Sequence, residues 1–179
     1  PNADGAAAVV LARRDLLPND FPHPLVRIAG TGNSSDTLAL HDRQDLLFFQ
    51  SAQVATSQAL KKAGIELEQI NFFEYHDAFS IYAALSLEAA GFAGRGQGWK
   101  LAADGSITLK GRIPCATMGG LKARGFTGGA TGVYQAGGAP KQLRGDAGPN
   151  QLAGARHGLI QAPGGPPSTA VSLILEKMD

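Results

Sequence analysis

The sequence predicts an α/β domain built on a mixed five-stranded sheet with helices on both faces. Short apolar runs typical of buried strands alternate along the chain with segments whose apolar residues recur at helical spacing. The length of 179 residues suits one domain of ordinary size, or two small ones at most. Hydrophobic residues make up 44% of the chain and charged residues 17%, which is typical of a folded globular protein rather than a disordered one.

Five apolar runs are expected to form the strands of one sheet. Each run is bounded by glycine, proline or charged residues, which commonly end strands. The expected strands are residues 5–12, 25–29, 70–75, 159–161 and 169–175, the last two joined in a β-hairpin. Pro18, Pro22 and Pro24 predict an extended linker over residues 15–24. A polar, glycine-containing turn is expected at residues 30–36.

Three helices are expected between these strands. They cover residues 50–63, 81–90 and 131–143. Gly64 and Gly91 directly follow the first two, and glycine at this place commonly ends a helix. The third helix contains Gly137, Gly138 and Pro140, which should shorten or kink it.

Glycine is abundant: 24 of the 179 residues, about 13%, are glycine, against a usual share of ~7%. The excess lies mostly after Gly91. Residues 94–111 are expected to form an irregular, glycine-rich segment with a hairpin at Asp104 and Gly105. Residues 114–132 predict a loop of repeated glycines. These glycines either bring backbone N–H groups against the oxygens of an anionic ligand or form structural turns. The loop lacks the patterns of a P-loop and of a dinucleotide-binding fold.

The composition argues against several classes of protein. Sixteen lysines and arginines balance fifteen aspartates and glutamates, so the net charge of +1 does not favour a nucleic-acid-binding protein. No run of about 18 apolar residues predicts a membrane span, and the first residues do not resemble a signal peptide. A single cysteine, Cys115, excludes an internal disulfide and a multi-cysteine zinc site. We therefore expect no metal and a reducing, cytoplasmic setting.

His76 is the strongest candidate for a functional residue. It follows the strand expected at residues 70–75, and ligands of α/β proteins bind at the carboxyl ends of strands. An imidazole there can hold a water molecule or polarise a carbonyl group. In the alternative interpretation, Asp77 caps the following helix and His76 only bonds a backbone carbonyl. Cys115 has no neighbouring base in the sequence, which favours a buried spectator thiol.

Four motifs, in the right order, resemble the C-terminal half of a thiolase. They are DGAAAVVLA at the start, EYHDAFS at residues 74–80, GGLKARG with GATGVYQ at residues 119–135, and QLRGDAG at residues 142–148. The HDxF pattern and the glycine loop are most similar to sterol-carrier-protein-type and archaeal thiolases, the lipid-transfer-protein branch. The resemblance implies a thiolase C-terminal domain over residues 25–179, preceded by a linker at residues 15–24. Residues 1–14 would then be the last strand of the N-terminal half.

The resemblance also implies an activity, that of an acetyl-CoA acetyltransferase acting on a coenzyme A thioester without a bound cofactor. His76 matches the HDxF histidine, which in the family positions a water or donates to the thioester oxygen. The family's acyl-accepting cysteine lies in the N-terminal half, on sequence not included here. The cysteine of HDCF falls on Ala78, and the histidine of GHP falls on Phe126. Since these groups transfer protons, we expect this chain alone to be inactive.

The family pattern also places the walls of a substrate site. The backbone N–H groups near Gly164 are expected to face the pocket, with Phe126 and Met118 as apolar walls. Met118 stands where the family's NxSGG motif has serine, and Ala116 stands where it has asparagine. An aromatic wall in place of histidine would favour a bulky acyl chain or sterol over acetyl.

Two other functions stay open. Some thiolase-like proteins of sterol side-chain breakdown are lyases that use tyrosines for retro-aldol cleavage of acyl-CoA, together with an OB-fold partner. Tyr75, Tyr82 and Tyr134 are available here, and Tyr134 is preferred because it follows the glycine loop. In the other alternative, the chain is a non-catalytic subunit that pairs with a competent thiolase. For any of these functions we expect a homo-oligomer, a dimer.

Overall fold

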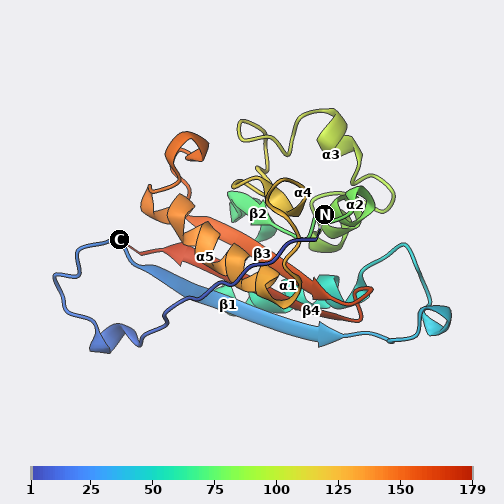
Figure 1. The fold of residues 1–179 in the computed structure, drawn as a ribbon, viewed down its shortest axis with the longest axis horizontal. Coiled ribbons are helices and arrows are strands. Elements are labelled where there is room, and N and C mark those ends of the chain that lie inside the picture. The colour runs from blue at the N-terminus through green and yellow to red at the C-terminus, as the bar shows by residue number, and fades with distance from the viewer. Residues whose placement is uncertain (1, 179) are drawn as a thin grey trace.

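A mixed sheet forms the centre of the computed structural model, which describes residues 2–178 (Figure 1). The strands are β1 (Val26–Ser35), β2 (Phe72–Glu74), β3 (His157–Gly164) and β4 (Thr169–Lys177), in the spatial order β1-β4-β3-β2. Strand β4 pairs antiparallel with both β1 and β3, and β3 pairs parallel with β2. The predicted mixed α/β sheet and its β3–β4 hairpin are confirmed, but the sheet has four strands rather than five.

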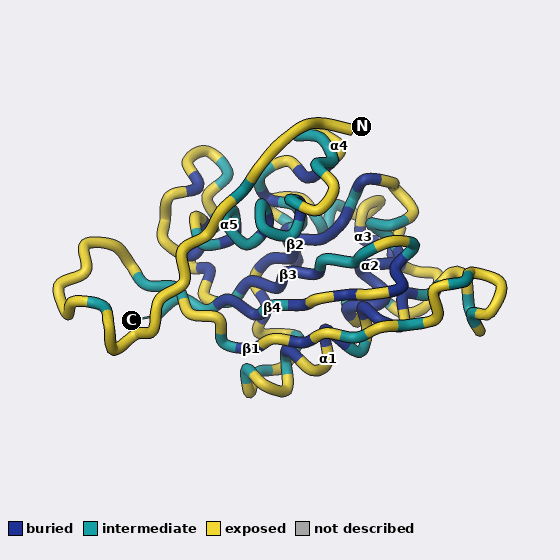
Figure 2. Tube along the Cα trace, turned by 60° about the horizontal axis from the view of Figure 1, so that its bottom comes forward, coloured by how far each residue is buried: buried dark blue, intermediate teal, exposed yellow. Residues whose placement is uncertain are grey.

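The strand predicted at residues 5–12 is the one that is wrong. These residues form no strand in the structure, and Figure 2 shows them as an exposed length of chain passing α5 (Thr131–Arg144). An apolar run becomes a strand only beside a hydrogen-bonding partner. The sheet edge at β2 is instead continued by one parallel bridge between Phe73 and Cys115. The Phe73 N–H donates to the Pro114 carbonyl, and the Ala116 N–H donates to the Phe73 carbonyl.

The turn predicted at residues 30–36 is also wrong, because β1 continues to Ser35. Its two glycines serve close packing rather than a turn. A Cβ atom at Gly30 would collide with the carbonyl oxygen of Ala59, and one at Gly32 with that of Ala55. Both alanines belong to α1 (Gln50–Ala63), so the helix backbone lies directly on β1.

The main helices occur where the sequence predicts them. Helix α1 ends at Gly64, which has a φ of 69°, and α2 (Ser80–Ala90) ends at Gly91, with a φ of 94°. Helix α5 accommodates Pro140 in its last turns. Two short helices, α3 (Lys100–Ala103) and α4 (Gly120–Arg124), lie in the glycine-rich regions. The hairpin predicted at Asp104 is absent, because the Asp104 carboxylate accepts the Ser106 N–H and makes a turn after α3.

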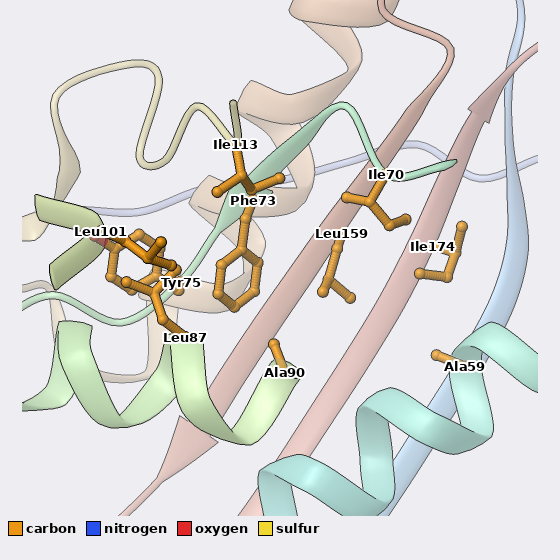
Figure 3. Close-up of a cluster of buried hydrophobic side chains, with 10 residues drawn as sticks. All are labelled: Ala59, Ile70, Phe73, Tyr75, Leu87, Ala90, Leu101, Ile113, Leu159 and Ile174. Atoms are coloured by element: carbon orange, nitrogen blue, oxygen red, sulfur yellow. The ribbon is translucent and has the colours of Figure 1, made fainter. Parts of the chain in front are cut away.

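Helices cover both faces of the sheet, as predicted. Figure 3 shows Phe73, Leu159 and Ile174 pointing toward the side of α1 and α2. A neighbouring residue of each strand points the other way: Phe72, Ile160 and Leu175 pack with Ala139 and Leu143 of α5. The strand end that carries His76 therefore lies between the layer of α1 and α2 and the layer of α5.

Candidate functional site

His76 lies directly after β2, at the carboxyl edge of the parallel pair β2 and β3. It is 8% exposed, and its ring meets that of Phe126 in a T-shaped contact with 5.0 Å between centroids. The Tyr82 ring lies 5.8 Å away on α2. Burial lowers the pKa of His76, and the Asp77 carboxylate opposes this shift only in part. The imidazole is therefore neutral at pH 7 and can donate from one nitrogen and accept at the other.

Asp77 does not cap α2, so this part of the alternative interpretation is wrong. Its Oδ1 accepts the backbone N–H of Leu121 at 2.6 Å, and no side chain caps the start of α2. Gly120 has a φ of 63°, and a Cβ atom there would collide with the Asp77 carboxylate. Gly120 at the start of α4 thus makes room for a carboxylate of the chain itself, which supports the structural interpretation of this part of the loop.

Glu74 holds the same strand end to the preceding loop. It is 4% exposed, and its Oε1 accepts both the backbone N–H of Thr117 at 2.9 Å and the Thr117 hydroxyl at 2.7 Å. Burial raises the pKa of Glu74. The loop that it holds contains Ala116 with a φ of 47°, an uncommon value for a residue other than glycine. Sequence reasoning missed Glu74, although a carboxylate inside an apolar strand is a signal in itself.

Gln135 is a second polar residue that the sequence did not single out. It is fully buried on α5, and its Nε2 donates to the carbonyl oxygen of Tyr75 at 2.7 Å. A glutamine on the buried face of a helix, four residues after Thr131, was the available signal. The bond ties α5 to the peptide that joins Tyr75 to His76.

The structure places the other predicted site residues on neighbouring elements. Met118 lies beside Gly138 of α5, and Tyr134 lies under the guanidinium of Arg124, 5.5 Å from ring centroid to Cζ. Gly164 ends β3 opposite Thr169. Within residues 2–178, no hydrogen bond or ring contact joins these three residues to His76. Of the predicted walls, Phe126 alone makes a ring contact with the histidine.

The tyrosines of the lyase alternative have different surroundings. Tyr75 is buried and stacks on Phe73 in the core, and burial raises its pKa far above that of a free tyrosine. Tyr82 makes T-shaped contacts with Phe49 and Phe79 and is the tyrosine whose ring approaches His76. Its approach to His76 was not anticipated, because the sequence favoured Tyr134.

Cys115 matches the expectation of a spectator thiol. Its Sγ–H points to the carbonyl oxygen of Ile113 at 3.2 Å, and burial raises its pKa well above the usual value. Within the described part of the chain, no group of three or more histidine, cysteine, aspartate or glutamate side chains could hold a metal ion. No helix among residues 2–178 has the length and apolar character needed to cross a membrane.

Two hollows lie away from His76. One of about 260 Å³ is lined by Leu67, Glu68, Ile70, Gly91, Phe92, Arg112 and Ile113. The other, of about 410 Å³, lies between the linker and the end of β4 and includes Arg14, Phe21, His23 and Lys177. The candidate site is therefore defined by the contacts around His76 rather than by either hollow.

The mixed sheet, with helices on both faces and a histidine of an HDxF motif at its edge, defines a domain of the thiolase class. Residues 32–177 match the family described as "Thiolase C-terminal domain-like", and the chain belongs to this family. It is 38% identical over 177 residues to an acetyl-CoA acetyltransferase of Methanothermobacter thermautotrophicus, covering 99% of this chain and 46% of the relative. It is 30% identical over 164 residues to sterol carrier protein 2 of Gallus gallus, covering 89% of this chain and 30% of that protein.

A solved structure titled "Ltp2-ChsH2(DUF35) aldolase" has the same fold. It superposes with a TM-score of 0.79 at 26% sequence identity, covering 88% of this chain and 41% of that chain. The present chain thus spans less than half the length of these relatives. The family assignment from the sequence motifs is confirmed.

Proposed function

We propose that this chain is the C-terminal part of a thiolase-fold acyl-CoA C-acyltransferase, and that His76 stabilises the thioester oxygen during acyl transfer. The observation that supports this most directly is a neutral, largely buried imidazole at the carboxyl edge of β2. Such an imidazole can donate a hydrogen bond to an oxygen that gains negative charge in the transition state. A preorganised donor of this kind contributes roughly 3–4 kcal/mol to lowering the barrier.

The remaining chemistry must come from outside this chain. Acyl transfer through a covalent intermediate needs a nucleophile and a base that activates it. Phe126 and Ala78 supply neither, and the Cys115 thiol is buried with a raised pKa. We therefore assign the nucleophile to the N-terminal half of the complete protein, with coenzyme A thioesters as the substrate and no bound cofactor. The curated relatives named as acetyl-CoA acetyltransferases, each more than twice the length of this chain, support this division.

Replacing His76 in the full-length protein tests this function. We expect His76→Ala to lower kcat for thiolysis or acyl transfer by about 10²–10³-fold, the usual cost of losing one oxyanion donor. His23→Ala is the matched control, because His23 lies exposed in the linker. Turnover that stays within about twofold of wild type in His76→Ala would mean that the histidine is structural.

A lyase is the second candidate, and the likeness to the solved aldolase favours it. In this case a tyrosine takes over proton transfer, with Tyr134 and Tyr82 as the candidates, and an OB-fold protein is the proposed partner. The full-length protein would release an aldehyde or ketone from a β-hydroxyacyl-CoA, and Tyr→Phe variants at both positions would identify the residue. A cysteine nucleophile in the N-terminal half, with acyl transfer to free coenzyme A, decides for the transferase.

We also propose that the protein is cytoplasmic and forms a homodimer.

A protein that is inactive with every thioester, and active only together with a second thiolase chain, would instead be a non-catalytic subunit. Size-exclusion chromatography with light scattering on the full-length protein measures the dimer directly.

A further inference from the structure

The peptide that joins Tyr75 to His76 lies just beyond the sheet. The parallel ladder between β2 and β3 ends with the pair Glu74 and Ile160. The next carbonyl, that of Tyr75, is held instead by the Gln135 side chain of α5, through the Nε2 donor at 2.7 Å. Gln135 is 1% exposed, so this bond is shielded from water.

We infer that Gln135 is a positioning residue for His76, since its amide fixes the Tyr75–His76 peptide and thereby the orientation of the imidazole against Phe126. The inference rests on the proposed function of His76. It adds to the site a residue of α5 that lies 60 residues after Tyr75 in the sequence.

The flanking residues are fixed by bonds of the same kind, from side chain to backbone. Glu74 accepts the Thr117 N–H, and Asp77 accepts the Leu121 N–H. Gln135 supplies the bond between these two, so that Glu74, Tyr75 and Asp77 are each held by a bond to a different segment. Helix α5 can approach closely because Gly132 faces Ala162 at the end of β3, where an added Cβ would lie 3.3 Å from that of Ala162.

The second polar atom of Gln135 argues against a role in packing alone. Its Oε1 is buried and has no hydrogen-bond partner within residues 2–178, and the same holds for the Thr131 hydroxyl one turn earlier. An apolar side chain of similar size would fill the space without an unsatisfied acceptor. An unsatisfied buried polar atom beside a candidate site is typical of residues retained for function.

The same helix offers a matched control. Gln142 is 2% exposed, and its Nε2 donates to the Asn150 carbonyl at 2.8 Å. Its Oε1 accepts the Leu152 N–H, and none of its partners adjoins His76. Gln135→Met and Gln142→Met therefore remove the same group from the same helix, but only the first removes a bond beside the histidine.

The experiment records the imidazole signals of His76 by NMR in the 179-residue chain, assigned with His76→Ala. The edge-to-face contact with Phe126 gives these protons a ring-current shift that depends steeply on ring orientation. We expect Gln135→Met to move the His76 signals and Gln142→Met to leave them in place, with both variants folded by circular dichroism. Unchanged His76 signals in folded Gln135→Met would overturn the inference. If Gln135→Met does not fold, Gln135→Leu is read in the same way, because its apolar side chain also has no donor for the Tyr75 carbonyl.

Kinetics of the full-length protein give the second measurement. We expect Gln135→Met to lower kcat about tenfold with KM within about twofold, and Gln142→Met to change neither. A loss in both variants alike would assign Gln135 to stability alone and would contradict the inference. If His76→Ala retains full turnover, the proposed function fails, whereas the NMR comparison still decides whether Gln135 orients the histidine.

Discussion

Glu74 makes a sharp prediction about the pH dependence of stability. Its carboxyl group is buried, and both of its observed hydrogen bonds are accepted by Oε1 from Thr117. A glutamine has an oxygen at the same place, so Glu74→Gln can keep both bonds while it removes the buried charge. Because burial raises the pKa of Glu74, the folded state binds a proton that the unfolded state has already released.

The sign and size of the effect follow from this difference of one proton. At pH values well below 4.5, the pKa of the group in the unfolded state, Glu74 is protonated in both states. There it contributes nothing to the pH dependence of the unfolding free energy. As the pH rises from 4.5 toward the raised pKa, the wild type loses up to about 1.4 kcal/mol of unfolding free energy per pH unit. Glu74→Gln does not share this loss, so we expect it to be the more stable protein at pH 7–8 and to lose the advantage near pH 4.5.

Urea unfolding of the 179-residue chain at several pH values between 4.5 and 8 measures this difference. Glu68→Gln, at an exposed position, is the control and should show a difference that does not vary with pH in this way. The reasoning is refuted if Glu74→Gln differs from the wild type by the same amount at every pH, or if it is less stable at pH 8.

Three further predictions concern activity and packing. The 179-residue chain should not cleave acetoacetyl-CoA faster than its own His76→Ala variant, because it lacks a nucleophile and its base; a clear rate difference in a coenzyme A-dependent thiolysis assay would contradict this. In the full-length protein, Phe126→His should raise KM for bulky acyl thioesters relative to acetyl thioesters, since it replaces an apolar wall by a polar ring; equal changes for both substrates would argue against such a wall. Gly32→Ala should lower the free energy of unfolding by about 1–3 kcal/mol, because the added Cβ would collide with the Ala55 carbonyl. Gly129 has open space around it, so Gly129→Ala should change this free energy little, and denaturant unfolding of both variants compares the two.

Local signals in the sequence predicted the helices well. Gly64 and Gly91 take positive φ values directly after α1 and α2, so the residue that ends each helix identified its boundary. The same residue type misled the prediction in β1. Gly30 and Gly32 looked like a turn, but they are there because another backbone lies against them. A single sequence does not distinguish these two uses of glycine.

The residues of the candidate site were likewise predicted only in part. His76 and Phe126 were predicted from motifs, and the structure brings their rings together. The bonds that hold the strand end were not predicted, because their partners are far apart in the chain: Glu74 and Thr117 are separated by 43 residues, and Tyr75 and Gln135 by 60. Contacts of this range depend on the tertiary arrangement of β2, the glycine loop and α5, which no local pattern encodes.

The pairing of β1 with β4 has a consequence for how the chain reaches this structure. Val26 lies opposite Lys177, so the ladder of β1 cannot be completed before residue 177 has been synthesised. At a synthesis rate of about 5–20 residues per second, this delay on the ribosome is roughly 8–30 seconds. Helix α1 is the next α-helix after β1 in the chain and can cover one of its faces during this time, with Gly30 and Gly32 as the contact. The edge of β1 that pairs with β4 stays open until β4 is made. Since closing so long a loop is slow, we expect this pairing to be the slow, aggregation-sensitive step of folding.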